Sequence, residues 1–149
     1  RELHRVARRK ERQAIVALPQ AAGGPRLILT SLPGEQHVLG LLMVEALFAL
    51  EGAECIPLGT QMPLLDICRA AEAHRADIVA LSFSIAFPPR QIPGLLEQLR
   101  AALPGSCELW VGGSGVERLT PPPGIACYSQ LEAGIAALAG WRQRHPRGQ

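Results

Sequence analysis

The chain has 149 residues, of which 48% are hydrophobic and 19% are charged, and its formal net charge is +2. These totals are ordinary for one globular domain, and a chain of this length buries roughly 68–70% of its unfolded surface. Glu45 and Glu51 interrupt the longest apolar stretch before it reaches the ~20 residues of a membrane span, and the opening residues lack the apolar core of a signal peptide, so we expect a cytoplasmic protein without a membrane partner.

The first segment of the chain is basic and has a helical pattern. Residues 1–12 hold six basic and two acidic side chains, whereas the other 137 residues hold nine basic and eleven acidic ones, a net −2. The main part of the chain therefore does not predict a nucleic-acid-binding surface. Apolar side chains in residues 1–18 recur at approximately helical spacing, and Gly23-Gly24-Pro25 is typical of a linker. We interpret residues 1–25 as the end of an upstream helical element plus a linker.

Strands and helices alternate from residue 26 onward. The expected strands are 26–31, 54–58, 77–84, 107–111 and 124–128, and the expected helices are 37–50, 63–74, 91–103 and 130–141. Five strands alternating with helices are typical of an α/β fold, here a flavodoxin-like doubly wound parallel sheet in the order 2-1-3-4-5 with helices on both faces. We assign residues 26–141 to this domain and residues 142–149 to a C-terminal tail.

Ligands of such sheets bind beyond the carboxyl ends of the strands, where the strand order reverses. In this chain that point lies between the first and third strands, beside the loop 32–37. Several known motifs are missing there: the chain has no P-loop, no GxGxxG after the first strand and no acceptor aspartate after the third. Ser114 lies between two glycines but lacks the spacing of a nucleophile elbow. These absences argue against a nucleotide site, a hydrolase and a response regulator.

The four cysteines are scattered through the domain and form no CxxC pair. They are Cys55, Cys68, Cys107 and Cys127. This spacing favours buried free thiols over a zinc site, and a core of this size does not need disulfides.

Glu35, His37 and Gly40 are the residues that are most informative about function. A histidine near a helix start is often a cap or a surface residue. A neutral imidazole can also bind a metal through one nitrogen while the other donates to a carboxylate, and Glu35 is two residues away. Gly40, one turn later, and Gly112 and Gly113, at the end of the fourth strand, leave room for a bulky group. One imidazole with space beside it predicts a metal that brings its other ligands, as in a macrocycle.

These residues resemble the motifs of the cobalamin-binding domain family, which are Asp-x-His-x-x-Gly, Ser-x-Leu and Gly-Gly after the first, third and fourth strands. The corresponding segments are Glu35-Gln36-His37-Val38-Leu39-Gly40, Ser82-Phe83-Ser84 and Gly112-Gly113. The resemblance covers about residues 26–140 and is strongest to the light-sensing MerR-type transcription regulators. It rests there on PGE-x-H-x-x-G, on a Leu-Gly-x-x-x-Pro turn at 58–63, and on Gly-Gly-x-Gly at 112–115. Glu in place of Asp agrees with that subgroup.

The resemblance implies a Rossmann-like sensory domain that binds adenosylcobalamin base-off. His37 would replace the cofactor's own benzimidazole as the lower axial ligand of cobalt, with Glu35 as its partner, while Ser82 and the glycines would line the slot for the displaced nucleotide tail. The cofactor-binding residues implied are Glu35, His37, Gly40, Ser82, Ser84, Gly112 and Gly113. Light would cleave the cobalt–carbon bond and change a homo-oligomeric state, and DNA would be bound through a domain outside this chain. No catalytic residue is implied.

Two positions depart from the family pattern. Ser84 stands where Leu is usual, and Ala86 stands where a second hydroxyl often helps to bind the tail, a loss of about 1 kcal/mol for one buried hydrogen bond. The helical bundle that covers the upper corrin face in these regulators has no match, because Trp110 is in a strand and Trp141 is C-terminal. Two alternatives stay open: a domain of this fold that has lost cobalamin, and a cobalamin-carrying module of a methyltransferase or mutase.

Overall fold

The computed structural model describes residues 24–146, so the predictions for residues 1–23 and 147–149 lie outside the described part. Within it, five strands form one parallel sheet in the order β2-β1-β3-β4-β5, which confirms the predicted topology. The strands are β1 (Arg26–Thr30), β2 (Glu54–Ile56), β3 (Ile78–Ser82), β4 (Glu108–Gly112) and β5 (Ile125–Tyr128). The helices are α2 (Leu39–Leu50), α3 (Leu64–Ala73), α4 (Ile92–Ala102) and α5 (Leu131–Arg144), with short 3₁₀ turns η1 (Pro89–Gln91) and η2 (Ser114–Val116).

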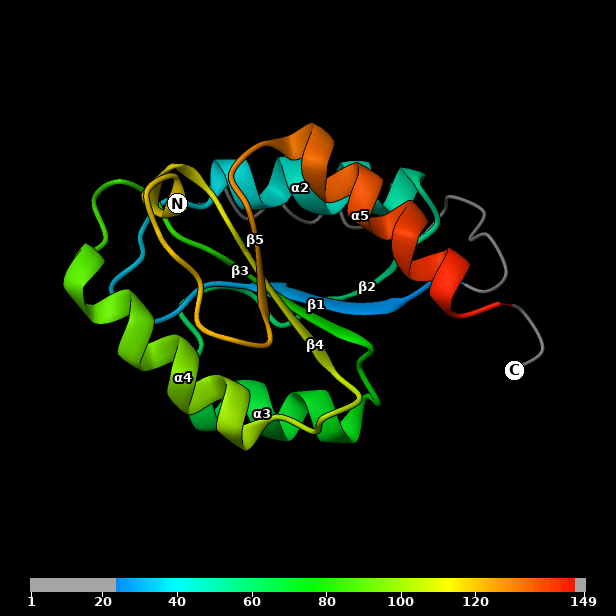
Figure 1. Cartoon of the computed structure of the whole chain (residues 1–149), viewed down its shortest axis with the longest axis horizontal. Coiled ribbons are helices and arrows are strands. Elements are labelled where there is room, and N and C mark those ends of the chain that lie inside the picture. The colour runs from blue at the N-terminus through cyan, green and yellow to red at the C-terminus, as the bar shows by residue number, and fades with distance from the viewer. Residues whose placement is uncertain (1–23, 147–149) are drawn as a thin grey trace, which may run out of the picture.

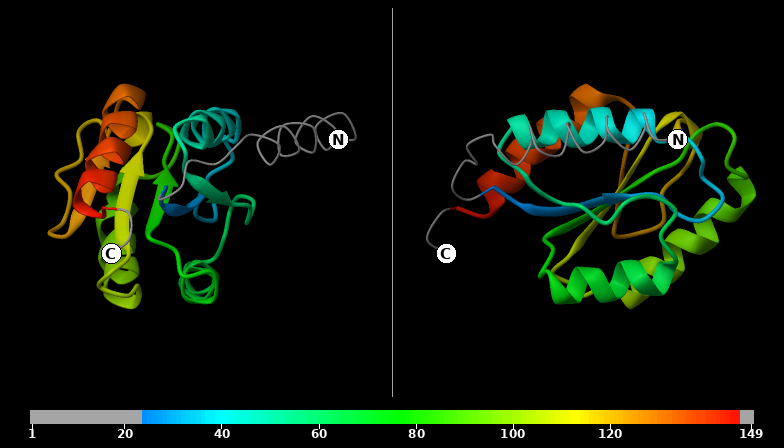
Figure 2. Two further views of the ribbon diagram at one scale, coloured as in Figure 1. Left: turned by 90° about the vertical axis from the view of Figure 1, so that its right-hand side faces the viewer. Right: turned by 180° about the vertical axis from the view of Figure 1, so that it is seen from behind.

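The sheet lies between two layers of helices, with α2 and α5 on one face and α3 and α4 on the other (Figures 1 and 2). Each face has its own core. Phe48 and Leu138 pack on the face of α2 and α5, and Ile67 and Leu96 pack on the face of α3 and α4. The central strand β3 is buried along Ile78–Leu81, because a parallel strand inside a doubly wound sheet is covered on both sides.

Two boundaries near the carboxyl edge of the sheet were predicted wrongly, and both errors have one cause. α2 begins at Leu39, two residues later than predicted, and β3 ends at Ser82, two residues before its predicted end. The backbone N–H groups of His37 and Ser84 donate instead to the carboxylate of Glu35, at 3.2 and 2.5 Å. Such side-chain acceptors compete with regular structure, and apolar periodicity does not reveal them.

Two more boundaries, the ends of α5 and β2, differ from the prediction. α5 continues beyond the predicted end at Trp141 to Arg144, and so takes in the start of the predicted tail. An ion pair of 3.1 Å between Arg144 and Glu108 holds this last turn against β4. β2 ends at Ile56, two residues earlier than predicted, and the remaining boundaries differ by at most one residue.

The four cysteines form no disulfide with one another. Cys68 and Cys107 are buried, as predicted, whereas Cys55 and Cys127 are half-buried. Burial raises the pKa of the Cys107 thiol to about 11, so this thiol stays protonated near neutral pH. No helix within residues 24–146 is long and apolar enough to cross a bilayer, and the cytoplasmic location stays a prediction.

Candidate functional site

A tight turn after β1 directs Glu35 into the protein. Pro33 and Gly34 occupy the middle of this turn, which the N–H of Glu35 closes by donating to the carbonyl of Leu32 at 3.1 Å. Gly34 has a φ of +100°, a conformation that glycine adopts without strain after a turn proline. The Pro-Gly pair therefore explains why a carboxylate that follows an exposed turn ends up only 1% exposed.

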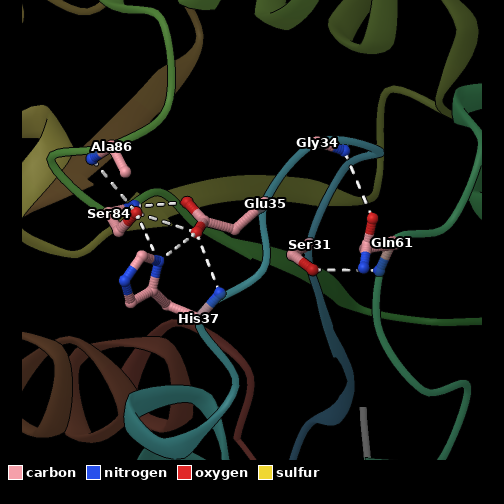
Figure 3. A network of polar contacts seen from close by, with 7 residues as sticks. All are labelled: Ser31, Gly34, Glu35, His37, Gln61, Ser84 and Ala86. Atoms are coloured by element: carbon pink, nitrogen blue, oxygen red, sulfur yellow. Dashed lines mark hydrogen bonds and ion pairs between the residues drawn. The ribbon is translucent and has the colours of Figure 1, made fainter.

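The loop between β2 and α3 fastens this turn from the side (Figure 3). Ser31 accepts a hydrogen bond from the N–H of Gln61 through its hydroxyl at 3.0 Å, and one from the N–H of Met62 through its carbonyl at 2.8 Å. The hydroxyl of Thr30 donates to the carbonyl of Gly59 at 2.8 Å. Sequence reasoning identified the turn at 58–63 only as part of a resemblance. Its structural role is to hold the loop that carries the site.

Glu35 is the centre of a small polar cluster formed with His37 and Ser84 (Figure 3). One carboxylate oxygen accepts from the N–H of Ser84 at 2.5 Å, and the other accepts from the Ser84 hydroxyl at 2.8 Å and from the N–H of His37 at 3.2 Å. Burial by itself raises the pKa of Glu35, but the hydrogen bonds from Ser84 and His37 outweigh it and hold the pKa below its ordinary value. Glu35 is therefore an anion near neutral pH.

The imidazole of His37 is held at one nitrogen only. Its Nδ1 lies 3.2 Å from Oε2 of Glu35 and 3.1 Å from the hydroxyl oxygen of Ser84, while the side chain is 66% exposed. A proton on Nδ1 satisfies both acceptors and leaves the lone pair of Nε2 free to bind a metal. The N-cap of α2 is Val38, so His37 is not the helix cap that its sequence position also allowed.

Ser84 and Ala86, the two departures from the family pattern, both take part in this cluster. The Ser84 hydroxyl donates to Glu35 and accepts from the N–H of Ala86 at 3.3 Å. The Ser84 side chain thus fixes the carboxylate that orients His37, a role that a leucine at this position does not supply. The sequence offered no signal for this contact, because Ser84 and Glu35 are 49 residues apart.

An apolar cavity of about 210 Å³ adjoins the cluster, between the sheet and the pair of helices α2 and α5. Four of the predicted site residues line it: Gly40, Ser82, Gly112 and Gly113. The other lining residues are Leu29, Leu41, Val44, Phe48, Ala80, Leu81, Trp110, Val111, Tyr128, Ser129, Gln130, Leu131 and Gly134. The seven predicted residues therefore fall into two neighbouring groups, four on the cavity and three in the polar cluster. The aromatic and α5 residues of the lining were not predicted.

Glycine occupies these positions of the site for two different physical reasons. A Cβ at Gly40 would meet nothing within 4 Å, so this position is open, as predicted. A Cβ at Gly113, whose φ is +98°, would overlap the carbonyl of Phe83, and one at Gly115 would overlap the carbonyl of Ser84. The Gly-Gly-x-Gly segment therefore lets the turn after β4 lie directly on the loop that carries Ser84.

The donor set suits a metal that carries its own ligands. Residues 24–146 contain no group of three or more His, Cys, Asp and Glu side chains that could hold a metal ion. His37 instead offers one exposed imidazole, with its other nitrogen on a carboxylate, beside an apolar cavity. This combination fits a large ligand with a coordinated metal and an apolar extension, bound at the carboxyl edge of a doubly wound sheet.

The chain belongs to the B12-binding domain family, whose model, described as B12 binding domain, matches residues 25–138. This match confirms the resemblance drawn from the motifs. The chain is 36% identical over 111 residues to the HTH-type transcriptional repressor CarA of Myxococcus xanthus, an alignment that covers 74% of this chain and 38% of CarA. It is 34% identical over 87 residues to the HTH-type transcriptional repressor CarH of the same organism, covering 58% of this chain and 29% of CarH.

The chain thus spans about a third of the length of these curated relatives. Among solved structures, it is similar to a chain of the methanol:cobalamin methyltransferase complex MtaBC from Methanosarcina barkeri, with a TM-score of 0.62 and 14% identity. This match covers 91% of the present chain and 56% of the other. At this identity the likeness establishes the fold.

Glu35→Gln should destabilise the domain near neutral pH, because the variant loses a buried anion that accepts four hydrogen bonds. Since the pKa of Glu35 is lowered from 4.5 in the folded state, its charge stabilises the fold above about pH 4.5, and this contribution disappears as the pH falls through the folded-state pKa. We expect a loss of about 1–3 kcal/mol in unfolding free energy at neutral pH and a smaller loss in acid, measured by urea denaturation.

The exposed Glu117→Gln is the matched control for removing one negative charge from the same chain. A Glu35→Gln loss that stays constant as the pH falls would show that the charge of Glu35 does not contribute to stability.

Proposed function

We propose that this chain is the sensory domain of a MerR-type transcription regulator and that it binds adenosylcobalamin base-off through His37. The observation that carries the proposal is the exposed imidazole of His37, held through Nδ1 by the buried carboxylate of Glu35. In this arrangement Nε2 of His37 would bind the cobalt in place of the cofactor's own base. When bound, the cofactor supplies a cobalt–carbon bond that light can cleave.

The residues around the imidazole set its properties as a ligand. Glu35 accepts the Nδ1 proton, which fixes the tautomer of His37 and raises the basicity of Nε2. Ser84 donates two hydrogen bonds to Glu35 and keeps the carboxylate in place. A stronger donor at Nε2 favours displacement of the cofactor's own base, which is what a base-off state requires.

The cavity is the site we propose for the displaced nucleotide tail. Its lining is mostly apolar, and the rings of Trp110 and Tyr128 meet edge to face with their centroids 5.2 Å apart. Such a lining suits a heteroaromatic base. Ser82, Ser129 and Gln130 add the polar groups that a sugar phosphate needs. Gly40, which is open above the cavity, lets the corrin approach the start of α2.

The regulator assignment is supported by the two relatives, both of which are transcriptional repressors. In our proposal the chain is therefore not an enzyme, forms homo-oligomers, and acts on DNA through a domain that lies outside this chain. The second candidate is a cobalamin-carrying module of a methyltransferase, which shares the fold. The domain that has lost cobalamin is the third, and the hydrogen bonds of Ser84 to Glu35 argue against it.

His37→Ala should abolish retention of adenosylcobalamin with the base-off, histidine-on spectrum, because no other imidazole lies in the cluster. The purified chain is mixed with the cofactor in the dark, passed through gel filtration and examined by visible absorption. His74→Ala is the matched control, since His74 is exposed at the end of α3 on the other face of the sheet. A colourless parent protein, in this chain and in the full-length protein, would establish the domain that has lost cobalamin.

Val44→Trp should remove the additional binding affinity that the nucleotide tail gives to cobalamin. Val44 lines the cavity, and an indole there fills the space that the tail would occupy. We expect the parent chain to bind cobalamin at least about tenfold more tightly than cobinamide, which lacks the tail, a difference of about 1.4 kcal/mol. The variant should bind both corrinoids about equally, as measured by absorption titration.

Leu65→Trp, at an exposed position of α3, controls for the added indole. If Val44→Trp leaves the preference for cobalamin unchanged, the tail does not occupy this cavity.

Illumination should change the oligomeric state of the adenosylcobalamin-loaded protein, and gel filtration in the dark and after light measures this change. The control is the same protein loaded with hydroxocobalamin, which lacks the cobalt–carbon bond and should give one elution position under both conditions. A loaded protein whose elution does not respond to light, in the full-length form as well, would favour the methyltransferase module.

A further inference from the structure

The outer side of α2 is unusual for a surface helix because it carries no exposed charge. Apart from Gly40 and Glu45, every residue of α2 is apolar, and Glu45 is buried. Among the described residues nothing covers Met43 and Leu50, which are 55% and 64% exposed. A helix that is apolar all round is normally buried on all sides, so this outer surface is the kind that another element covers.

We propose that residues 1–18 of this chain form an amphipathic helix that docks on the outer side of α2, against Met43 and Leu50. Ala14, Ala17 and Leu18 fall on one side of such a helix, and Leu3, Val6 and Ala7 extend the same side toward its start, with Lys10 among them. At 100° per residue, Arg1, Arg5, Arg8, Arg9 and Arg12 fall on the opposite side, where they would face water. The segment therefore has one apolar side that needs cover, as α2 does.

The place where the segment joins the domain brings it to α2. The carbonyl of Pro25 accepts a hydrogen bond of 2.8 Å from the N–H of Glu54, and the N–H of Ala53 donates to the carbonyl of Phe48 in the last turn of α2. The chain thus enters the domain next to the end of α2 that carries Leu50. Residues 19–25 span at most about 3.3–3.6 Å each, so the segment can reach all of α2, whose length is about 1.5 Å per residue.

The short linker also favours this contact over a contact between two chains. A segment joined by a short linker is present at its neighbouring surface at an effective concentration in the millimolar range. A modest apolar contact is enough for docking under this condition, whereas a second copy must bind from dilute solution. The docking does not depend on cobalamin, and its test uses the cofactor-free chain.

Oxidation of Met43 measures whether its side chain is covered. The chain has two methionines, and the half-buried Met62 in the loop before α3 serves as the internal reference. Dilute hydrogen peroxide is applied to the whole chain, and the rate of sulfoxide formation at each methionine is followed by peptide mass spectrometry. We expect Ala17→Asp and Leu18→Asp each to accelerate oxidation of Met43 several-fold and to leave Met62 unchanged.

Val16→Asp is the matched control, because Val16 falls on the side of the predicted helix that carries the arginines. It should leave the Met43 rate unchanged. Equal Met43 rates in the parent and in Ala17→Asp and Leu18→Asp overturn the proposal, since the surface is then open. Protection of Met43 that disappears when the parent chain is diluted also overturns it, since a second copy is then the cover. Protection that survives dilution and is lost only in the Ala17 and Leu18 variants supports it.

Discussion

The burial of the Glu35 carboxylate is the constraint on which the geometry of the site depends. A carboxylate taken out of water is stable only if other donors replace the water. Here the donors are the N–H and hydroxyl of Ser84 and the N–H and ring nitrogen of His37. Because these residues follow β1 and β3, the two loops cannot separate without leaving a buried charge unpaired. The position of the imidazole is thus a consequence of how Glu35 is buried.

The fold could be predicted because turn residues in the sequence separate the strands from the helices. Apolar runs form the strands, and Pro33-Gly34 and Pro104-Gly105 mark the turns before the site and before β4. The strand order followed from the alternation of strands and helices, which the doubly wound class restricts to few arrangements. The start of α2 and the end of β3 were missed because side-chain hydrogen bonds to Glu35 decide them.

The site could be predicted only in part, and the missing part consists of contacts between distant residues. Spacing pointed to Glu35, His37 and Gly40, which are neighbours along the chain. The contact of Ser84 with Glu35 and that of Gln61 with Ser31 join loops that only the folded sheet brings together. Gly112 and Gly113 were interpreted as space for a ligand, whereas Gly113 is also required by the close approach of the backbone at Phe83. The sequence alone does not show whether a glycine makes room for a ligand or for a neighbouring backbone.

The polar cluster alone does not distinguish a sensor from a carrier module, because both uses require an imidazole that a carboxylate holds in one tautomer. The difference must lie in how the site is connected to the rest of a longer protein. α2 begins two residues after His37, and its inner side lines the cavity through Leu41 and Phe48. A ligand that shifts the start of this helix also moves its outer side, because packed helices move as rigid units. In our proposal, a segment docked on Met43 and Leu50 would receive that movement directly, which is a connection that a sensor needs and a carrier does not.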